Sequence, residues 1–580
     1  MDSGRFLLAV VLMIAVMVVT NLLLPPEPPP VDPMAPDTTA VGPATVPAGE
    51  PPGAVLDTMA AGDAGQAAPA PAVPVDTGAT PGLTTPAATA GVSADTIVAR
   101  TALYDYRVST AGAGIVGAEL HQHIVLDPAR HGQPVELSWD TVPGLFSYRL
   151  RVGTREIPLD DLNFLPSASG VVDVAGGQPG TLELRHEGED LGIVVAYAFD
   201  PDRYVITGRM VVTGLGGQAP TLLINLPRRL AMNEANPQED ERMLEYVVNA
   251  DRDGVSKVRL NSVRAQRVEN GPLHWAAVKN KYFVAAAVTH PESPTAFGGL
   301  VANPVSEPNA ADMYVTLQPD PDGTFGFRFY IGPQEPRRLA EVGQKFSDVN
   351  PFGWRAFRIF LQPLGHGITA ALYWMHDNLG IGYGWVLVLF GVLIRIALWP
   401  LNAKAMRSQM KNMEIQPRMK EIQAKYKNEP EKLQKELLRL YKEEGFNPMG
   451  GCLPMLIPLP ILITLFFVLQ STIAFRGVPF LWLPDLSRAD PFYILPVLLG
   501  VSMFLMQWLS MRSMTDQNPQ MKFMMYAMPP VMTIIFLNFA SGLNLYYAAM
   551  NFASIPQQLQ ISRERKRFQQ ARQGAPKAEA

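Results

Sequence analysis

Apolar residues gather in long runs at the start of this chain and in its last third. The runs at 6–24, 383–401, 449–470, 491–511, 523–540 and 542–561 contain few charges. A helix that crosses hydrocarbon needs about 20 mostly apolar residues, so these runs predict six transmembrane helices. The first is an anchor behind a short cytoplasmic N-terminus at 1–5, and the other five form the membrane core. Prolines in the later runs are compatible with membrane helices, because neighbouring helices can satisfy the freed carbonyl groups.

The pattern changes twice between the first run and the second. Residues 25–95 are rich in Pro and Ala and contain no Lys or Arg, which predicts a disordered tether. Residues 96–345 alternate apolar and polar positions, for example at 181–185, 193–199 and 204–213. Short alternating stretches broken by turn residues predict one large antiparallel β-sandwich. The sequence DPDG at 320–323 indicates a hairpin turn.

Residues 346–380 have the pattern of an amphipathic helix lying on the membrane surface. Trp354, Phe357, Phe360 and Leu361 share one side, and Pro363 is expected to interrupt the run. An ordinary helix that closes the β domain is the alternative.

Positive charge fixes the expected orientation. The loop 402–447 holds eleven Lys/Arg and seven Glu, and the loop 512–522 and the tail 562–580 are also basic. The loop 471–490 is balanced. Because short cytoplasmic loops carry an excess of Lys and Arg, both termini are expected in the cytoplasm. The β domain and the loop 471–490 then lie outside.

The loop 402–447 has the periodicity of a helical hairpin. Met406, Met410 and Met413 lie on one helical face, and Met419 belongs to a second face after Pro417. A third apolar face follows at 433–441. Methionine adapts to varied apolar partners, so the stripe is a candidate contact surface. Packing of the two hairpin helices on each other explains the same pattern.

The residue content and the absence of certain motifs limit the kinds of active site and metal site that the chain could contain. Apolar residues make up 48% of the 580 residues and charged residues 17%. The one cysteine, Cys452, lies in an apolar run and is interpreted as a small hydrophobic residue. His121 and His123 alternate onto one face of a strand without a third ligand, so no metal site is predicted. HExxH and GxxxxGK[ST] motifs are absent, and the predicted spans contain no Asp, Glu or His. We therefore expect neither an enzyme nor a cofactor.

Arg395 is the only Lys or Arg within the last five predicted spans. A charge at that depth costs about 2.5–3.5 kcal/mol on insertion scales. Two interpretations remain open. The side chain reaches the membrane surface near Trp399, or it lies in a hydrated recess. The last span carries a polar stripe, which favours the recess. The stripe consists of Asn544, Tyr547, Asn551, Ser554 and Gln558, and Asn538 lies just before it. Hydrogen bonding between helices is the simpler explanation of that stripe.

Three motifs resemble those of the YidC membrane protein insertase family in its Gram-negative form. They are NPMGGCLP at 447–454, LPDLS at 483–487 followed by DPFYILP at 490–496, and SGLNLYY at 541–547. The resemblance implies an inner-membrane protein with a periplasmic β domain and a hydrophilic groove open to cytoplasm and lipid. In that family Arg395 would match the groove arginine and Tyr547 a groove tyrosine. Asn538, Asn544 and Asn551 complete the expected groove.

The resemblance also implies partners. Nascent membrane proteins would reach the groove through the methionine-rich hairpin, and insertion would proceed alone or with the Sec translocon, without nucleotide hydrolysis. The hairpin and the basic tail would contact the ribosome and lipids, and no binding to DNA is expected. Anchoring of the tail at the membrane surface is an alternative explanation of its basic residues. A small-solute channel or transporter is the alternative function. A receptor whose β domain binds periplasmic partners is a third.

Overall fold

The computed structural model describes residues 95–139, 144–174, 177–352, 357–402, 418–419, 421–427, 429–443, 458–511 and 519–573. The predicted anchor, the tether, Trp354 and the residues Met406, Met410 and Met413 lie outside them. The described β domain and the helices after it belong to one compact unit.

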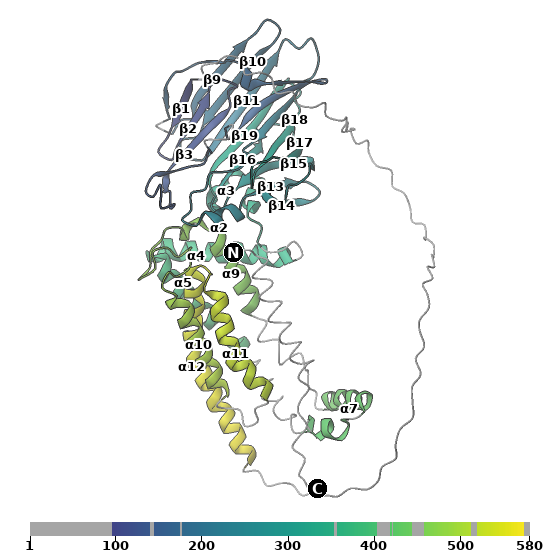
Figure 1. Cartoon of the computed structure of the whole chain (residues 1–580), viewed down its shortest axis with the longest axis vertical. Coiled ribbons are helices and arrows are strands. Elements are labelled where there is room, and N and C mark those ends of the chain that lie inside the picture. Colours follow the sequence, from purple (N-terminus) through teal and green to yellow (C-terminus); the bar gives the residue numbers. More distant parts are fainter. Residues whose placement is uncertain are drawn as a thin grey trace, which may run out of the picture. The chain divides into compact units, whose positions relative to one another are not determined.

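Two sheets build the β domain (Figure 1). The smaller sheet has five strands in the order β4-β3-β2-β1-β8. Its strands are β1 Thr96–Arg100, β2 Tyr104–Ser109, β3 Ile115–Ile124, β4 Pro134–Glu136 and β8 Val171–Asp173. Neighbouring strands are antiparallel except β1 and β8, which are parallel.

The larger sheet has 14 strands, and the order along its main path is β6-β5-β12-β18-β17-β15-β16-β19-β11-β10-β9-β7. The strands of its first half are β5 Ser147–Val152, β6 Arg155–Pro158, β7 Leu165–Pro166, β9 Gly180–Glu187, β10 Gly192–Phe199, β11 Val205–Thr213 and β12 Thr221–Leu226. Those of its second half are β13 Glu245–Ala250, β14 Gly254–Arg259, β15 Arg267–Lys279, β16 Phe283–Thr289, β17 Phe297–Pro304, β18 Ala311–Leu317 and β19 Thr324–Pro333. β13 pairs with β14 and β15 beside this path.

The alternating stretches fold as predicted, because successive side chains of a strand point to opposite faces. Residues 181–185 and 193–199 lie within β9 and β10, and residues 204–213 contain the whole of β11. Their inward residues join a single core with those of the smaller sheet. Tyrosine hydroxyls bridge the sheets: Tyr106 donates to the Ile331 carbonyl at 2.5 Å, and Tyr197 to the Ala113 carbonyl at 2.7 Å.

The predicted hairpin at 320–323 is wrong. The turn itself forms, since the Gly323 amide donates to the Asp320 carbonyl and Gly323 has a φ of 81°. The strands on either side do not pair, however: β18 lies between β12 and β17, whereas β19 lies between β16 and β11. Turn chemistry is local, but strand pairing depends on contacts distant in sequence.

The helices after the sandwich are α3 Pro336–Val342, α4 Arg358–Leu379, α5 Tyr383–Ala397, α7 Pro430–Glu443, α9 Pro458–Ser471, α10 Ile494–Met511, α11 Pro519–Phe536 and α12 Ser541–Gln573; α2 Pro237–Arg242 belongs to the β domain. The expected break at Pro363 is wrong, because α4 runs through it. Pro363 lies inside the helix, which continues although one backbone hydrogen bond is lost there. Leu361 is buried on α4, whereas Phe357 and Phe360 are exposed.

Within the described residues, none of the helices taken singly is both long and apolar enough to span a bilayer. The pair α4 and α5 passes that test jointly, with a bend of 119° at its break, and shorter apolar helices run at Pro460–Ser471, Ile494–Leu509 and Tyr526–Phe536.

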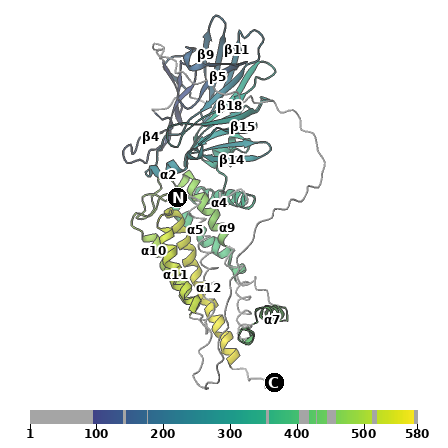
Figure 2. The same cartoon turned by 45° about the vertical axis from the view of Figure 1, so that its right-hand side comes forward.

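Contacts between these helices give their relative directions. Gly500 of α10 lies against Thr533 of α11, and Phe504 against Tyr526, so α10 and α11 are antiparallel. Ser502 contacts Asn551, and Ser562 contacts the Leu509 carbonyl, so α10 and α12 run parallel. Figures 1 and 2 both show α10, α11 and α12 side by side. Residues of α5, α9, α10 and α12 share a second apolar core.

Trp275 on β15 tests the sandwich core. It is fully buried, its indole Nε1 donates to the Gln344 carbonyl at 3.1 Å, and Phe346 packs edge-on against it. Replacing it by alanine (Trp275→Ala) should lower the free energy of unfolding of the β domain by about 3–5 kcal/mol. Val268→Ala on the same strand, where the side chain is 47% exposed, should change it by at most about 0.5 kcal/mol. Urea unfolding of the full chain, followed by circular dichroism, checks the difference, and equal losses would contradict it.

Candidate functional site

Helices α5 and α12 form the framework of the candidate site. Leu387 lies against Gly542, Gly391 lies against Tyr546 and Met550, and the Trp399 carbonyl lies 3.5 Å from Gln557 Nε2. Residue numbers rise together along both helices, so the helices are parallel. Arg395, four residues beyond Gly391, therefore lies at the level of about residues 551–554 of α12, since each helical residue rises about 1.5 Å.

The close approach at Gly391 requires the absence of a side chain. A Cβ atom added there would lie 2.9 Å from the Tyr546 carbonyl oxygen and 3.3 Å from the Met550 amide nitrogen. Such a Cβ would meet backbone atoms, which cannot rotate away. Glycine thus brings α5 against α12 one turn from Arg395.

Arg395 is half-buried, and its Nε atom has no hydrogen-bond partner among the described residues. Asn551 lies at the same level and donates from Nδ2 to Ser502 Oγ of α10 at 3.0 Å. Three helices therefore bring polar side chains to one level inside an apolar bundle.

The other predicted groove residues lie elsewhere. Asn544 is buried and donates to the Phe536 carbonyl at 3.1 Å, and the Tyr547 ring stacks on Phe536 at 5.7 Å. Both lie nearer the first turns of α12 than Asn551 does. Asn538 is exposed and lines a small cavity with Glu239 and Lys281 of the β domain. The structure thus brings Asn551 to the level of Arg395 and separates Asn538 from it.

Sequence reasoning missed three further polar residues that have buried side-chain atoms. Buried side-chain atoms that lack a hydrogen-bond partner within the described ranges include Asn402 Nδ2, Gln507 Oε1 and Gln557 Oε1. Buried polar atoms are normally paired with protein groups or with water. Gln507 interrupts an apolar run, and that signal could have identified it. Together with Arg395 and the Asn551–Ser502 pair, these three residues define what we term the inner polar face: Arg395, Asn402, Ser502, Gln507, Asn551 and Gln557.

Little of the predicted hairpin surface can be described. Met419 is half-buried, and its sulfur accepts a hydrogen bond from the Tyr441 hydroxyl at 3.8 Å. Leu440 is buried on the same face of α7. The part of the hairpin that is seen therefore packs on itself, which is the simpler of the two explanations for its apolar stripes.

The two histidines of β3 have different surroundings. His121 Nε2 lies 3.4 Å from Asp105, whereas His123 packs edge-on against Phe283. Burial, with a smaller effect from Arg476, lowers the pKa of His123 to about 4, so this ring is neutral at pH 7. Over the described ranges, no group of three His, Cys, Asp or Glu side chains is placed to hold a metal ion.

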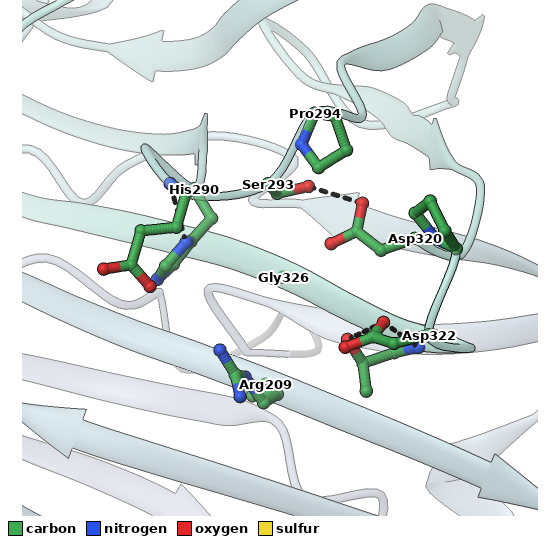
Figure 3. A pocket seen from close by; sticks show the side chains of 10 residues that line it. Arg209, His290, Ser293, Pro294, Asp320, Asp322 and Gly326 are labelled. Carbon is green, nitrogen blue, oxygen red and sulfur yellow. Dashed lines mark hydrogen bonds between the residues drawn. The ribbon is translucent and has the colours of Figure 1, made fainter.

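A separate polar cavity of about 280 Å³ opens on the β domain (Figure 3). Arg209 of β11 and His290 lie on one side of it, and Asp320 and Asp322 on the other. Asp320 accepts hydrogen bonds from the hydroxyls of Ser293 and Thr295 at 2.7 and 2.5 Å. Its lining belongs wholly to the β domain and includes none of the inner polar face.

Two family models match most of the chain. One, described as the YidC periplasmic domain, matches residues 96–365, and the other, described as a 60Kd inner membrane protein, matches residues 374–569. These matches define the class as inner-membrane proteins that carry a periplasmic β-sandwich domain.

Similarity to individual proteins identifies the family within this class. The chain is 30% identical over 522 residues to the membrane protein insertase YidC of Cupriavidus necator, covering 87% of each chain. It is 31% identical over 544 residues to that of Ralstonia nicotianae, covering 91% of this chain and 90% of the relative. A solved structure described as an active YidC insertase with the first transmembrane domain resolved is 18% identical, with a TM-score of 0.32, over 80% of this chain and 94% of that one. The sequence matches show that the chain belongs to the YidC membrane protein insertase family.

Enlarging Gly391 tests the α5–α12 contact. Gly391→Leu should force the helices apart and lower the free energy of unfolding by about 1–3 kcal/mol, because the added atoms meet backbone. Gly367→Leu on α4 is the control, since an added Cβ there meets nothing within 4 Å. Thermal unfolding of the full chain in detergent measures both variants. A loss at Gly367 as large as that at Gly391 would contradict the tight contact.

Proposed function

We propose that the chain is a membrane protein insertase and chaperone that receives its substrates in a hydrophilic groove. The observation that carries the proposal is the inner polar face, where α5, α10 and α12 bring Arg395, Ser502 and Asn551 to one level of an apolar bundle. Polar groups without protein partners require water. Water inside the cytoplasmic half of the bilayer shortens the hydrocarbon path that a polar segment must cross.

Arg395 supplies the attraction in this scheme. A cation in a partly desolvated recess interacts with an anion more strongly than it does in bulk water. An acidic or polar segment of a nascent chain would enter the groove beside Arg395. The adjoining apolar helix would then move into lipid, at about 25 cal/mol for each Å² of apolar surface removed from water. That free energy drives insertion without nucleotide hydrolysis.

The proposed topology has six transmembrane helices with both termini in the cytoplasm and the β domain in the periplasm. The opposite directions of α10 and α11, and the shared direction of α5, α10 and α12, support the alternation of the later spans. Several large apolar side chains of α4 and its N-cap residue are exposed, which supports contact of that helix with lipid: Phe357, Ile359, Phe360 and Trp374.

The remaining partners follow from charge and from the family. Arg563 and Arg567 at the end of α12 are exposed and could pair with phosphates of ribosomal RNA or of lipids. We propose that the methionine-rich hairpin, which includes Met406, Met410, Met413 and Met419, receives nascent chains. Work with the Sec translocon is proposed on the family resemblance alone.

A small-solute channel or transporter is the second candidate and would need a path through the outer half of the bundle. Ser541, Asn544 and Leu543 are at most 1% exposed at the outer end of α12, which favours a groove closed on that side.

Photo-crosslinking tests the groove directly. Probes at positions 395, 547 and 551 should cross-link to a stalled membrane nascent chain. Matched probes at Ile396 and Phe552, the exposed neighbours on the same helices, should cross-link mainly to lipid. Nascent-chain cross-links that are equal at inner and outer positions, or confined to the controls, would exclude the groove.

Reversing the charge at Arg395 tests the electrostatic part. Arg395→Glu should slow insertion of substrates with acidic tails by roughly tenfold or more, the factor that about 1.4 kcal/mol produces. Substrates with neutral tails should be affected several-fold less, because only the acidic tail is then repelled. Insertion is measured by protease protection in proteoliposomes, with Arg395→Gln as the uncharged control. An equal loss for both tail types would show that Arg395 does not act through charge.

A further inference from the structure

Arg476 is an almost fully buried cation in the loop between α9 and α10, which we term the outer loop (residues 472–493). Its side chain is 4% exposed, and Nε donates to Glu234 Oε1 at 2.7 Å. Glu234 is 9% exposed and lies between β12 and α2 of the β domain. The two residues are separated by 242 positions in the sequence.

The surroundings of this ion pair are polar and well matched. Arg476 Nη2 lies 3.4 Å from the Asn233 carbonyl, and the guanidinium lies 5.4 Å from the centre of the Phe283 ring. Asp240, which is fully buried, accepts the amides of Asn233 and Lys281 at 3.1 and 3.3 Å.

Further charged groups complete the cluster. Lys281 Nζ lies 2.9 Å from Glu239 Oε1, and Asp485 of the outer loop accepts hydrogen bonds from the amide and the hydroxyl of Ser487. A cavity of about 20 Å³ lies between Lys281, Glu239 and Ser487. This volume holds about one water molecule.

The outer loop also holds the first turn of α12. The Ser541 amide and hydroxyl both donate to the Arg488 carbonyl at 2.6 Å, and the Gly542 amide donates to the Leu486 carbonyl at 2.9 Å. The first amides of a helix have no partner within the helix itself, so the loop supplies their acceptors. A displacement of the outer loop would therefore remove these bonds and free the start of α12.

We propose that the Glu234–Arg476 ion pair holds the outer loop on the β domain and thereby keeps the outer end of α12 closed. Arg476 and Glu234 are positioning residues in this arrangement. Removing one partner of a buried pair leaves an uncompensated charge, whereas replacing both partners together is much better tolerated. The ion pair thus favours one position of the outer loop on the β domain over other positions.

The cost of burial supports this view. Burial raises the pKa of Glu234 to about 7, and the neighbouring Asp240 adds to the rise, even though Arg476 opposes it. Moving the guanidinium away would raise the pKa of Glu234 further, because Arg476 is the main group that stabilises the ionised carboxylate. The inference goes beyond the proposed function, and the labelling test below needs no insertion activity.

Cysteine labelling in the full chain tests the proposal, with Cys452→Ser as the background. Ala540→Cys reports on the small cavity that Ala540 lines, and Ala548→Cys reports on a 3% exposed position two turns into α12. A membrane-impermeant maleimide is applied from whichever membrane face labels Leu481→Cys, a 70% exposed position of the outer loop. This choice keeps the test independent of the proposed topology.

Arg476→Met should raise the labelling rate at both probes roughly tenfold or more. Arg476→Lys, which keeps the charge, should restore most of the protection. The double variant Glu234→Gln with Arg476→Met should label more slowly than the product of the two single effects predicts. Arg185→Met removes an exposed ion pair with Glu183 on β9 and should change nothing.

Three results would overturn the proposal. Unchanged labelling in Arg476→Met would show that the pair does not hold the loop. Faster labelling at position 540 but not at 548 would show that the loop moves without opening α12. Equal effects of Arg476→Lys and Arg476→Met would show that charge is not the cause. If Arg476→Met does not reach the membrane, Glu234→Gln replaces it, because this variant conserves the side-chain volume. The labelling rates at positions 540 and 548 are then measured in Glu234→Gln, and the rates in Arg476→Lys are compared with those of Glu234→Gln.

Discussion

A polar atom inside an apolar bundle must find a protein partner or water, and the helical half of this protein is organised by that requirement. The described helices α5, α9, α10 and α11 supply no carboxylate to neutralise Arg395. The parallel course of α5, α10 and α12 brings Arg395, Ser502 and Asn551 to one level instead. Hydration would stabilise the guanidinium at this level, and the groove proposed above rests on it.

The β-sandwich could be predicted in outline because its strands have a period of two that is visible in single segments, such as 193–199. The pairing order could not. The turn at 320–323 has typical turn residues, yet it joins strands that lie apart in the sheet. The continuity of α4 through Pro363 could not be predicted either. A proline costs a helix one backbone hydrogen bond, but the packing of Leu361 and Ile368 on the second core outweighs that local cost.

The site was predictable in part. Arg395 and Asn551 are conspicuous because each interrupts an apolar run. A stripe on one helix does not reveal which neighbour it faces, so Ser502 as the partner of Asn551 could not be deduced. Asn538 precedes the same helix, but the chain turns there and leaves it beside Glu239 and Lys281. The Glu234–Arg476 pair has no sequence signal at all, since neither residue lies in a motif.

The length of α12 has a mechanical consequence. The helix runs for 33 residues, from Ser541 to Gln573, and continues through Pro556. At about 1.5 Å per residue it measures about 50 Å, whereas hydrocarbon is about 30 Å thick. If α12 crosses the bilayer as proposed, its last turns stand clear of the lipid as a stiff rod. Arg563 and Arg567 would then lie at a fixed height above the membrane. A small tilt of α12 within the bilayer would displace these two side chains laterally by a larger distance.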